Sequence, residues 1–509
     1  MIQDLVIGID SSTTATKVIA WDNCGKNIAE ASSPITLCSP GSGCYEQDPQ
    51  DWWNSAAAAL TNLLHLADKE RVAALAIANQ RETFVALNKE GEPLRPSIIW
   101  LDERCKEQVD KFAGTFGEDR IHKITGKPKD YAPVAYRLAW MKEHEGDLFG
   151  KVNKFCDVQS YLVHKLTGQF RTSWASADPL GLFDLENKVW SSDILRQLEI
   201  DTDQLPETFR PGDLLGYVTR AAAEQSGLKA GTPVVAGGGD GQSAGLGVNA
   251  LGPGRAYLNL GTAVVSGTFA SNYIVDKAFR TMASCSSHGY YCETSLRAGT
   301  FLIDWFIKQI LGTSMSQEQN IYDTLEEEAK QVAPGCEGLV ILPYWNAVMN
   351  PYWDTDARGC IIGLSSGHSR GHLYRAILEG IALEQTLATE SVEQVIGNKT
   401  NEFALIGGGA KSKLWSQIIA DTSDKLVLHM ASDEASSLGA GISAAVASGW
   451  FPSFKEAAMK MTKISTITEP VPENVIRYRE LSPIYRDIYP GLRGIFKRIQ
   501  KYKTSPGKV

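Results

Sequence analysis

One carboxylate stands among glycines near the middle of the chain, in segment 237–241, which reads Gly-Gly-Gly-Asp-Gly and contains Asp240. Glycine lets the backbone come close to a ligand because it has no side chain to clash. A carboxylate in such a place can accept a proton from a hydroxyl group while that group attacks another atom. The alternative is an aspartate that caps a helix starting in the same turn. The segment alone favours neither a general base nor a helix cap.

Two common nucleotide-binding patterns do not account for this segment. Residues 239–244 fit the pattern G-x-G-x-x-[GA] of dinucleotide-binding folds. That pattern is weak without an acidic residue about 20 positions later to bind the ribose. Residues 255–275 contain no Asp or Glu, and no G-x-x-x-x-G-K-[ST] occurs in the chain. We therefore expect neither a Rossmann-type site nor a P-loop.

Three strand-and-turn units could present backbone N–H and hydroxyl groups to phosphate. The first joins a buried strand predicted over 5–9 to a second strand over 17–21, through a turn that contains Asp10 and four Ser or Thr residues. The others lie at 256–262 and 403–410. Successive N–H groups in such turns bind anions. Their wide spacing along the chain predicts two similar domains that face each other across a nucleotide cleft.

The periodicity of apolar residues predicts further elements of an α/β fold. They are helices over 51–66, 155–168 and 412–422 and strands over 73–78 and 83–87. The chain has 509 residues, whereas a single hydrophobic core stops growing near roughly 250–300 residues. We therefore expect two domains, residues 1–250 and residues 251–509.

Composition and charge limit the partners. The net charge of −9 disfavours nucleic acid and anionic membrane surfaces. Nine scattered cysteines form no C-x-x-C pair, which predicts neither a disulfide framework nor a zinc site. No stretch approaches the length of about 18 apolar residues that a membrane helix needs. Asp4 and Asp10 also interrupt the region in which a signal peptide would be apolar. We expect a cytoplasmic protein that binds neither nucleic acid nor membranes.

Several segments, taken in order, resemble the FGGY family of carbohydrate kinases, which includes glycerol, xylulose and ribulose kinases. The segments are 8–17 for the first phosphate motif, 237–240 for the catalytic aspartate, 259–262 for the second phosphate motif, 359–379 for a family signature and 407–410 with Trp415 for the adenosine motif. The resemblance implies two actin-like, ribonuclease-H-like domains with ATP bound in the cleft between them.

The resemblance also implies roles for individual residues. Asp240 would accept the proton of the acceptor hydroxyl, and Asp10 would hold Mg²⁺ mainly through water. The expected ATP-binding residues are Asp10, Thr13, Thr14, Lys17, Gly261, Thr262, Gly408, Gly409, Ala410 and Lys413. The chain departs from the usual first motif at Ser12 and Lys17, where the family commonly has Gly and Arg. Lysine keeps a cation near the phosphates but lacks the bidentate fork of arginine.

The acceptor site is expected around segment 79–83, Asn-Gln-Arg-Glu-Thr, which is similar to glycerol kinases whose Arg and Glu bind polyol hydroxyls. Arginine donates and glutamate accepts hydrogen bonds, so the pair suits a hydroxyl-rich ligand. The expected acceptor-binding residues are Arg81, Glu82, Trp100, Tyr131, Asp240 and Gln242. A core position for Trp100 is equally consistent with the sequence, and the pair 81–82 could also be a solvated ion pair.

The sequence leaves the identity of the acceptor open. Segment 405–421 is closer to xylulose kinases than to glycerol kinases. A ketopentose such as D-xylulose is therefore the first prediction, and glycerol or another polyol is the alternative. A relative that binds sugar and nucleotide without transferring phosphate is an alternative of a different class, which the presence of both Asp10 and Asp240 disfavours. A homodimer is consistent with the resemblance, because dimers are common in the family.

Overall fold

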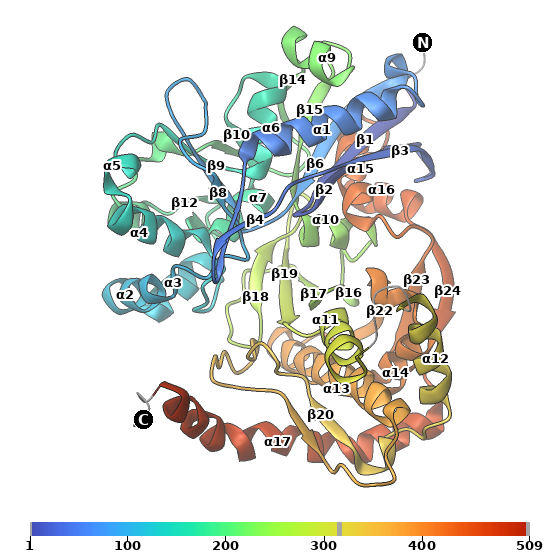
Figure 1. Cartoon of the computed structure of the whole chain (residues 1–509). Helices are drawn as coiled ribbons and strands as arrows, with labels where there is room; N and C mark the ends of the chain where they lie inside the picture. Colours follow the sequence, from blue (N-terminus) through green and yellow to red (C-terminus); the bar gives the residue numbers. More distant parts are fainter. Residues whose placement is uncertain (1–2, 313–317, 505–509) are drawn as a thin grey trace.

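The computed structural model describes residues 3–312 and 318–504. The chain forms two lobes, each built on one mixed β-sheet (Figure 1). The first sheet has, in spatial order, β14 (Leu214–Tyr217), β15 (Pro233–Gly239), β6 (Val72–Asn79), β1 (Leu5–Ser11), β2 (Ala15–Trp21) and β3 (Asn27–Pro34). The second has β18 (Arg280–Ala283), β19 (Tyr290–Leu296), β17 (Val264–Ala270), β16 (Gly254–Leu260), β22 (Thr400–Ile406), β23 (Leu426–Met430) and β24 (Ile464–Thr468).

The two sheets share the same central topology. β1 is antiparallel to β2 and parallel to β6, and β6 is parallel to β15. In the second sheet β16 is antiparallel to β17 and parallel to β22, which is parallel to β23. Each lobe therefore begins with a hairpin whose first strand joins a set of parallel strands. The predicted α/β fold with two similar domains is confirmed.

Helices cover the first sheet on both faces. They are α1 (Pro49–Leu64) and α6 (Val158–Thr167) on one face and α10 (Asp240–Gly247), α15 (Ala435–Ala447) and α16 (Phe454–Met461) on the other. Leu5, Ile7 and Ile9 share a core with α1 and α6. Val6, between them in sequence, belongs to the core on the α15 face. Successive strand residues point to opposite faces, so a strand that is apolar throughout requires a cover on each side.

The second sheet is covered in the same manner. α13 (Arg370–Ile396) and α14 (Lys413–Ser423) pack on one face, where Leu258 and Leu405 are buried. On the other face, Tyr257 shares a core with Ala244 of α10 and Ala435 of α15. α10 and α15 thus lie between the two sheets. α15 and α16 follow β23 in sequence yet pack against β1 and β2 of the first lobe (Figure 1). The division of the chain near residue 250 stays a prediction.

α10 and α15 approach each other so closely that glycine is required at their contact. A Cβ atom on Gly439 of α15 would lie 1.9 Å from the backbone oxygen of Ser243 in α10. A Cβ atom on Gly247 of α10 would lie 2.0 Å from the backbone oxygen of Ala435. Either atom would overlap the neighbouring backbone, which cannot move aside as a flexible side chain can. These glycines therefore set the distance between the two helices.

A smaller five-stranded sheet extends the first lobe along one side of the cleft. Its strands, in order, are β4 (Cys38–Gly41), β5 (Cys44–Gln47), β8 (Ser97–Ile98), β7 (Phe84–Leu87) and β9 (Lys154–Asp157). Three helices lie beside it: α2 (Lys106–Phe116), α3 (Glu118–Thr125) and α4 (Val134–His144). Trp100 follows β8, and Tyr131 lies in the loop between α3 and α4. This part of the chain therefore carries both predicted aromatic residues of the acceptor site.

The predicted helices are partly confirmed. The helix expected over 51–66 is α1, which has Pro49 in its first turn and Asp48 as its N-cap. The helix expected over 155–168 is wrong at its start, because residues 154–157 pair with β7 as strand β9. α6 begins only at residue 158, where the Asp157 side chain accepts a hydrogen bond from the backbone N–H of Ser160. Both Asp48 and Asp157 illustrate how an N-cap aspartate fixes a helix start.

The remaining elements connect or flank these layers. The helices are α5 (Gly146–Phe149), α7 (Trp174–Ala177), α8 (Ser192–Leu198), α9 (Arg220–Ser226), α11 (Thr300–Trp305), α12 (Glu318–Lys330) and α17 (Pro472–Thr504). Three strand pairs are β10 (Arg171–Ser173) with β13 (Glu207–Phe209), β11 (Phe183–Asp184) with β12 (Val189–Trp190), and β20 (Val340–Leu342) with β21 (Cys360–Ile362). Within the described ranges, none of the helices combines the length and apolar character that crossing a bilayer demands.

We expect Gly439→Ala to destabilise the protein by about 2–3 kcal/mol, because the added methyl group must push α15 away from α10. Gly494→Ala is the matched control: it also lies in a helix, α17, but a Cβ there meets nothing within 4 Å. The control should be neutral or up to about 1 kcal/mol more stable, since alanine favours helix more than glycine. Urea denaturation of both variants measures these changes, and a Gly439→Ala protein as stable as the wild type would contradict this packing.

Candidate active site

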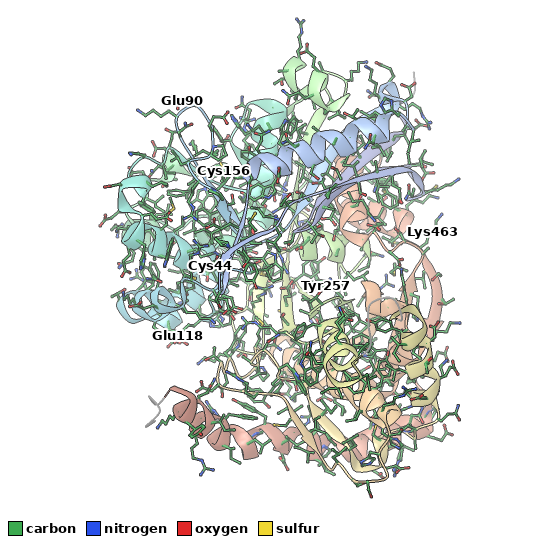
Figure 2. The ribbon with its side chains drawn as sticks, in the orientation of Figure 1. Cys44, Glu90, Glu118, Cys156, Tyr257 and Lys463 are labelled. Atoms are coloured by element: carbon green, nitrogen blue, oxygen red, sulfur yellow. The ribbon has the colours of Figure 1, made fainter. Side chains whose placement is uncertain are left out.

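A cavity of about 420 Å³ lies between the two lobes. Nine residues expected from the sequence line it: Asp10, Thr13, Arg81, Glu82, Trp100, Tyr131, Asp240, Gly261 and Thr262. Tyr257, another lining residue, is labelled at the centre of Figure 2, where the lobes meet. Segments far apart in sequence thus converge on one cavity, whose volume suits a small ligand.

Asp240 faces this cavity from the junction of β15 and α10. Its side chain is 41% exposed, and its Oδ1 lies 3.0 Å from Nε of Arg81. Oδ1 also accepts a hydrogen bond from the backbone N–H of Gly241 at 2.7 Å. The N-cap of α10 is Gly239, where no side-chain cap bond forms. Of the two interpretations of Asp240, the structure thus favours a carboxylate that faces a ligand site.

The two expected phosphate motifs occupy equivalent hairpins in the two lobes. The turn between β1 and β2 is closed by the N–H of Ser12, which donates to the carbonyl of Ala15 at 3.0 Å. The turn between β16 and β17 is closed by the N–H of Gly261, which donates to the carbonyl of Ala263 at 3.1 Å. Thr13 of the first turn and residues 261–263 of the second line the cavity. The cavity therefore lies between two hairpins of the same topology.

Asp10, near the end of β1, is half-buried beside other carboxylates. Its Oδ1 has no hydrogen-bond partner within the described part of the chain. Burial, and then the negative charges of Asp240 and Glu434, raise the pKa of Asp10 to about 7, while Lys17 opposes the shift. A bound cation would give this carboxylate oxygen a partner and would offset the negative charges around it. The chemistry of this site therefore fits a hard divalent cation such as Mg²⁺.

Magnesium ions usually keep several water ligands and bind few protein groups directly. The described residues contain no group of three or more His, Cys, Asp or Glu side chains arranged to hold a metal ion. Asp10 with bound water and phosphate oxygens is the donor set that this site could offer.

Several expected nucleotide residues lie outside the cavity. Thr14 is exposed at the surface of the first hairpin, and Lys17 Nζ pairs with Glu434 Oε1 at 2.5 Å. Gly408, Gly409 and Ala410 form a short 3₁₀ turn after β22. This turn touches the second hairpin, because a Cβ on Gly409 would lie 2.8 Å from Cβ of Leu260. Lys413 is exposed at the start of α14.

Gln242 does not reach the cavity either. Its side chain is fully buried, and its Nε2 donates to the backbone oxygen of Ala175 at 2.9 Å. Residues two apart on a helix point about 200° apart, so Gln242 faces away from the cavity that Asp240 lines. Gly241, the residue between them, lines the cavity in its place.

The predicted acceptor pair lies at the end of β6 and is not a solvated ion pair. Arg81 is 9% exposed, and its Nη1 donates to Glu293 Oε2 at 2.8 Å. Glu82 is buried, and its Oε1 accepts from Arg280 Nη1 at 2.9 Å. Burial raises the pKa of Glu82, while the positive charges of Arg280 and Arg81 oppose the shift. Each predicted residue thus pairs with an opposite charge from the second lobe.

The two aromatic residues form one wall of the cavity. Trp100 is 41% exposed, which excludes a core position. Its Nε1 donates to Oγ1 of Thr13 in the first hairpin at 2.9 Å. The guanidinium of Arg297 lies 4.6 Å from the ring centroid of Tyr131. A larger cleft of about 1080 Å³ shares Trp100, Tyr131 and Arg297 with the cavity, so the two spaces adjoin at these residues.

Comparison with known proteins identifies the family. The N-terminal domain of the FGGY family of carbohydrate kinases matches residues 5–247, and the C-terminal domain of the same family matches residues 256–448. This chain belongs to the FGGY family. The predicted fold of two actin-like domains is therefore confirmed, and the protein is a carbohydrate kinase, an enzyme that phosphorylates a sugar-like acceptor.

Individual relatives of this FGGY chain agree with the assignment. Xylulose kinase of Bacillus subtilis (strain 168) is 29% identical, over 98% of this chain and 99% of its own length. Gluconokinase of the same organism is 24% identical, over 98% of both chains. The crystal structure of xylulose kinase from Rhodospirillum rubrum has a TM-score of 0.90 and 28% identity, and the match covers 97% of this chain and 100% of that chain.

Two charged residues that pair with the cavity residues Arg81 and Glu82 in this FGGY kinase were not predicted from the sequence. Arg280 lies on β18 and Glu293 lies on β19, directly opposite each other in the antiparallel ladder. The only local sign was a charged residue in each of two otherwise apolar or neutral strands, Arg-Thr-Met-Ala and Tyr-Tyr-Cys-Glu-Thr-Ser-Leu. Buried charges of this kind are rare unless they are paired.

We expect Asp10→Asn to stabilise the ligand-free protein while abolishing activity. The pKa of about 7 in the folded protein exceeds the ordinary value of 3.8. Ionising Asp10 therefore weakens the folded state progressively as pH rises from about 4 to about 7, and the loss is complete above that range. The asparagine variant should gain up to about 4 kcal/mol near pH 8 and clearly less near pH 5. Thermal unfolding at both pH values tests this, and equal melting temperatures near pH 8 would contradict it.

Proposed function

We propose that the protein transfers the terminal phosphoryl group of ATP to a hydroxyl of a small sugar, with the ketopentose D-xylulose as the first candidate. The observation that carries the proposal is Asp240, which faces a cavity between two equivalent hairpins of the two lobes. The relatives from Bacillus subtilis and Rhodospirillum rubrum are xylulose kinases, which favours xylulose as the acceptor.

Asp240 would act as the general base. Phosphoryl transfer depends mainly on positioning and charge stabilisation. A sugar hydroxyl is barely ionised at neutral pH, so a carboxylate within hydrogen-bond reach accepts its proton as the bond to phosphorus forms. Arg81, 3.0 Å from Asp240 Oδ1, holds this carboxylate towards the cavity, and the buried Arg81 is itself fixed by Glu293.

The nucleotide would lie against both hairpins. Thr13, Thr14 and Lys17 would face the phosphates from the first lobe, and Gly261 and Thr262 would face them from the second. The turn 408–410 and Lys413 would lie beside the adenosine. Asp10 would hold Mg²⁺ largely through water, and the bound ion would neutralise charge on the phosphates. Closure of the lobes would exclude water, which limits wasteful hydrolysis of ATP.

A polyol such as glycerol is the second candidate acceptor. The observation that favours it is segment 79–83, whose Arg81 and Glu82 line the cavity together with Trp100 and Tyr131. The pair of Arg81 and Glu82 resembles the Arg and Glu that bind polyol hydroxyls in glycerol kinases. In either case Glu82 would accept hydrogen bonds from acceptor hydroxyls and Arg81 would donate them.

A coupled assay of ADP release tests the acceptor. The panel contains D-xylulose, D-ribulose, glycerol and D-gluconate at equal concentrations. We expect D-xylulose to give the highest kcat/KM. A higher value with glycerol would favour the second candidate. If no member of the panel stimulated ADP release, the proposed acceptors would be wrong.

The variant Asp240→Asn tests the proposed base. Loss of a general base lowers kcat by about 10²–10⁴-fold, whereas ATP affinity should change by less than about twofold. Asp213→Asn is the control, because Asp213 pairs with Arg210 near the surface and does not line the cavity. Turnover numbers and nucleotide titrations give both values. Comparable turnover in the wild type and Asp240→Asn would overturn the assignment.

A further inference from the structure

A buried carboxylate from the second lobe joins the predicted acceptor residues of the first. Glu293 Oε2 accepts a hydrogen bond from Arg81 Nη1 at 2.8 Å, and its Oε1 accepts one from Arg280 Nε at 2.6 Å. Tyr257 Oη donates to Oε2 at 2.6 Å. The Glu293 side chain is 0% exposed, so these groups, and not water, satisfy its charge.

The two arginines keep Glu293 ionised. Burial by itself raises the pKa of this carboxyl, but the charges of Arg280 and Arg81, with hydrogen bonds from Arg81 and Tyr257, outweigh burial and lower the pKa to about 2. A buried ion pair that loses one partner is strongly destabilised, because the other charge is left uncompensated. Glu293 therefore fixes the positions of both guanidinium groups.

The same two arginines bind the carboxylates that face the cavity. Arg81 Nε lies 3.0 Å from Asp240 Oδ1, and Arg280 Nη1 donates to Glu82 Oε1 at 2.9 Å. The chain of alternating charges therefore runs Asp240, Arg81, Glu293, Arg280, Glu82. It contains three carboxylates and two guanidinium groups, so it carries no excess of positive charge.

The third arginine of the cavity is also paired. Arg297 Nη2 donates to Asp130 Oδ2 at 2.7 Å, and its guanidinium stacks on the ring of Tyr131. All three arginines that line the cavity thus have a carboxylate partner. The half-buried Asp10 adds a further carboxyl group to the lining. Among the described residues that line the cavity, every positively charged side chain is paired, and none remains to balance a negatively charged acceptor.

This arrangement distinguishes two kinds of acceptor. A hydroxyl group can accept from an arginine N–H and donate to a carboxylate at the same time, without separating the pair. A carboxylate can only accept, so it must compete with Asp240 or Glu82 for an arginine and leave a buried charge unpaired. Juxtaposed like charges are an effective way to reject a wrong ligand.

We propose that Glu293 is a positioning residue that holds Arg81 and Arg280 in a charge-balanced acceptor site, and so selects neutral polyhydroxyl acceptors against acceptors that carry a carboxylate. The inference rests on the proposed function, in that the 420 Å³ cavity is the acceptor site. It goes beyond that function by assigning the selection to a residue of the second lobe that need not touch the acceptor.

The decisive experiment compares wild-type enzyme with Glu293→Gln on a neutral and an anionic acceptor. kcat and KM are measured separately for D-xylulose, for D-gluconate and for ATP. Removing one negative charge frees part of an arginine, so KM for D-xylulose should rise at least about tenfold, while the ratio of kcat/KM for gluconate to that for xylulose should also rise at least about tenfold. KM for ATP should change by less than about twofold.

Glu384→Gln is the matched control. Glu384 is likewise a buried glutamate of the second lobe, and it accepts hydrogen bonds from Tyr485 and Tyr344 at 2.7 and 2.9 Å, outside the cavity. Its acceptor ratio should equal that of the wild type within about twofold. If Glu293→Gln fails to fold, Arg280→Lys replaces it. That variant keeps the charge but loses the fork that bridges Glu82 and Glu293, so the ratio should fall.

The outcomes separate this inference from the proposed function. An unchanged acceptor ratio in Glu293→Gln and in Arg280→Lys, with full activity on D-xylulose in the wild type, would overturn the inference and leave the function intact. A wild type that prefers gluconate to every neutral acceptor would also overturn the inference. If glycerol is the acceptor, the proposed substrate fails, and the inference is tested with glycerol and D-glycerate. If no acceptor is turned over, calorimetric binding of the same ligands supplies the ratio.

Discussion

α10 and α15 meet through their backbones because Gly439 and Gly247 leave no side chain between them. This contact sets the spacing of the two sheets, since the helices fill the space between β1 and β6 on one side and β16 and β22 on the other. Asp240 is the first residue of α10, so its position in the cleft is determined by packing and not by a flexible loop. A catalytic group on a rigid element can be held close to the required geometry.

Charge is the second constraint on this region. The cavity gathers Asp10, Asp240 and Glu82 within a largely buried setting, where like charges destabilise the fold. Arg81 and Arg280 offset part of that repulsion, and Glu293 fixes both of them. Asp10 retains an unpartnered oxygen among the described residues, which agrees with a group whose partner arrives with the substrate. The remaining repulsion among these carboxylates lowers the stability of the ligand-free protein, at a site where function requires the charges.

Features that depend on a short stretch of sequence could be predicted. The hairpins at residues 10–14 and 259–263 and the glycine-rich segment around Asp240 have local patterns, and the structure brings both hairpins and Asp240 to one cavity. The exclusion of Gln242 from the cavity depends on the direction that each residue takes on α10, which a motif does not reveal. The strand over 154–157 was missed because a short apolar run before a helix suits either structure.

Features that depend on the meeting of distant segments could not be predicted. Arg280 and Glu293 acquire their partners only when β18 pairs with β19 and the second lobe meets the end of β6. A single charged residue in an apolar strand forms no sequence pattern from which its ion-pair partners could be predicted. The close contact of α10 and α15 could likewise be predicted only if it were known that these two helices lie between the sheets.

The hydrogen bond between Trp100 and Thr13 has a consequence for how two ligands would affect each other. The indole N–H occupies one lone pair of the Thr13 hydroxyl, so the hydrogen of that hydroxyl must point elsewhere, towards Gln80 Oε1 at 3.4 Å or towards an anion in the turn. Gln80 in turn is held by Gln47, which also binds the backbone of Thr13. Any molecule that displaces the indole therefore changes the hydrogen-bonding partners that the Thr13 hydroxyl can take in the turn.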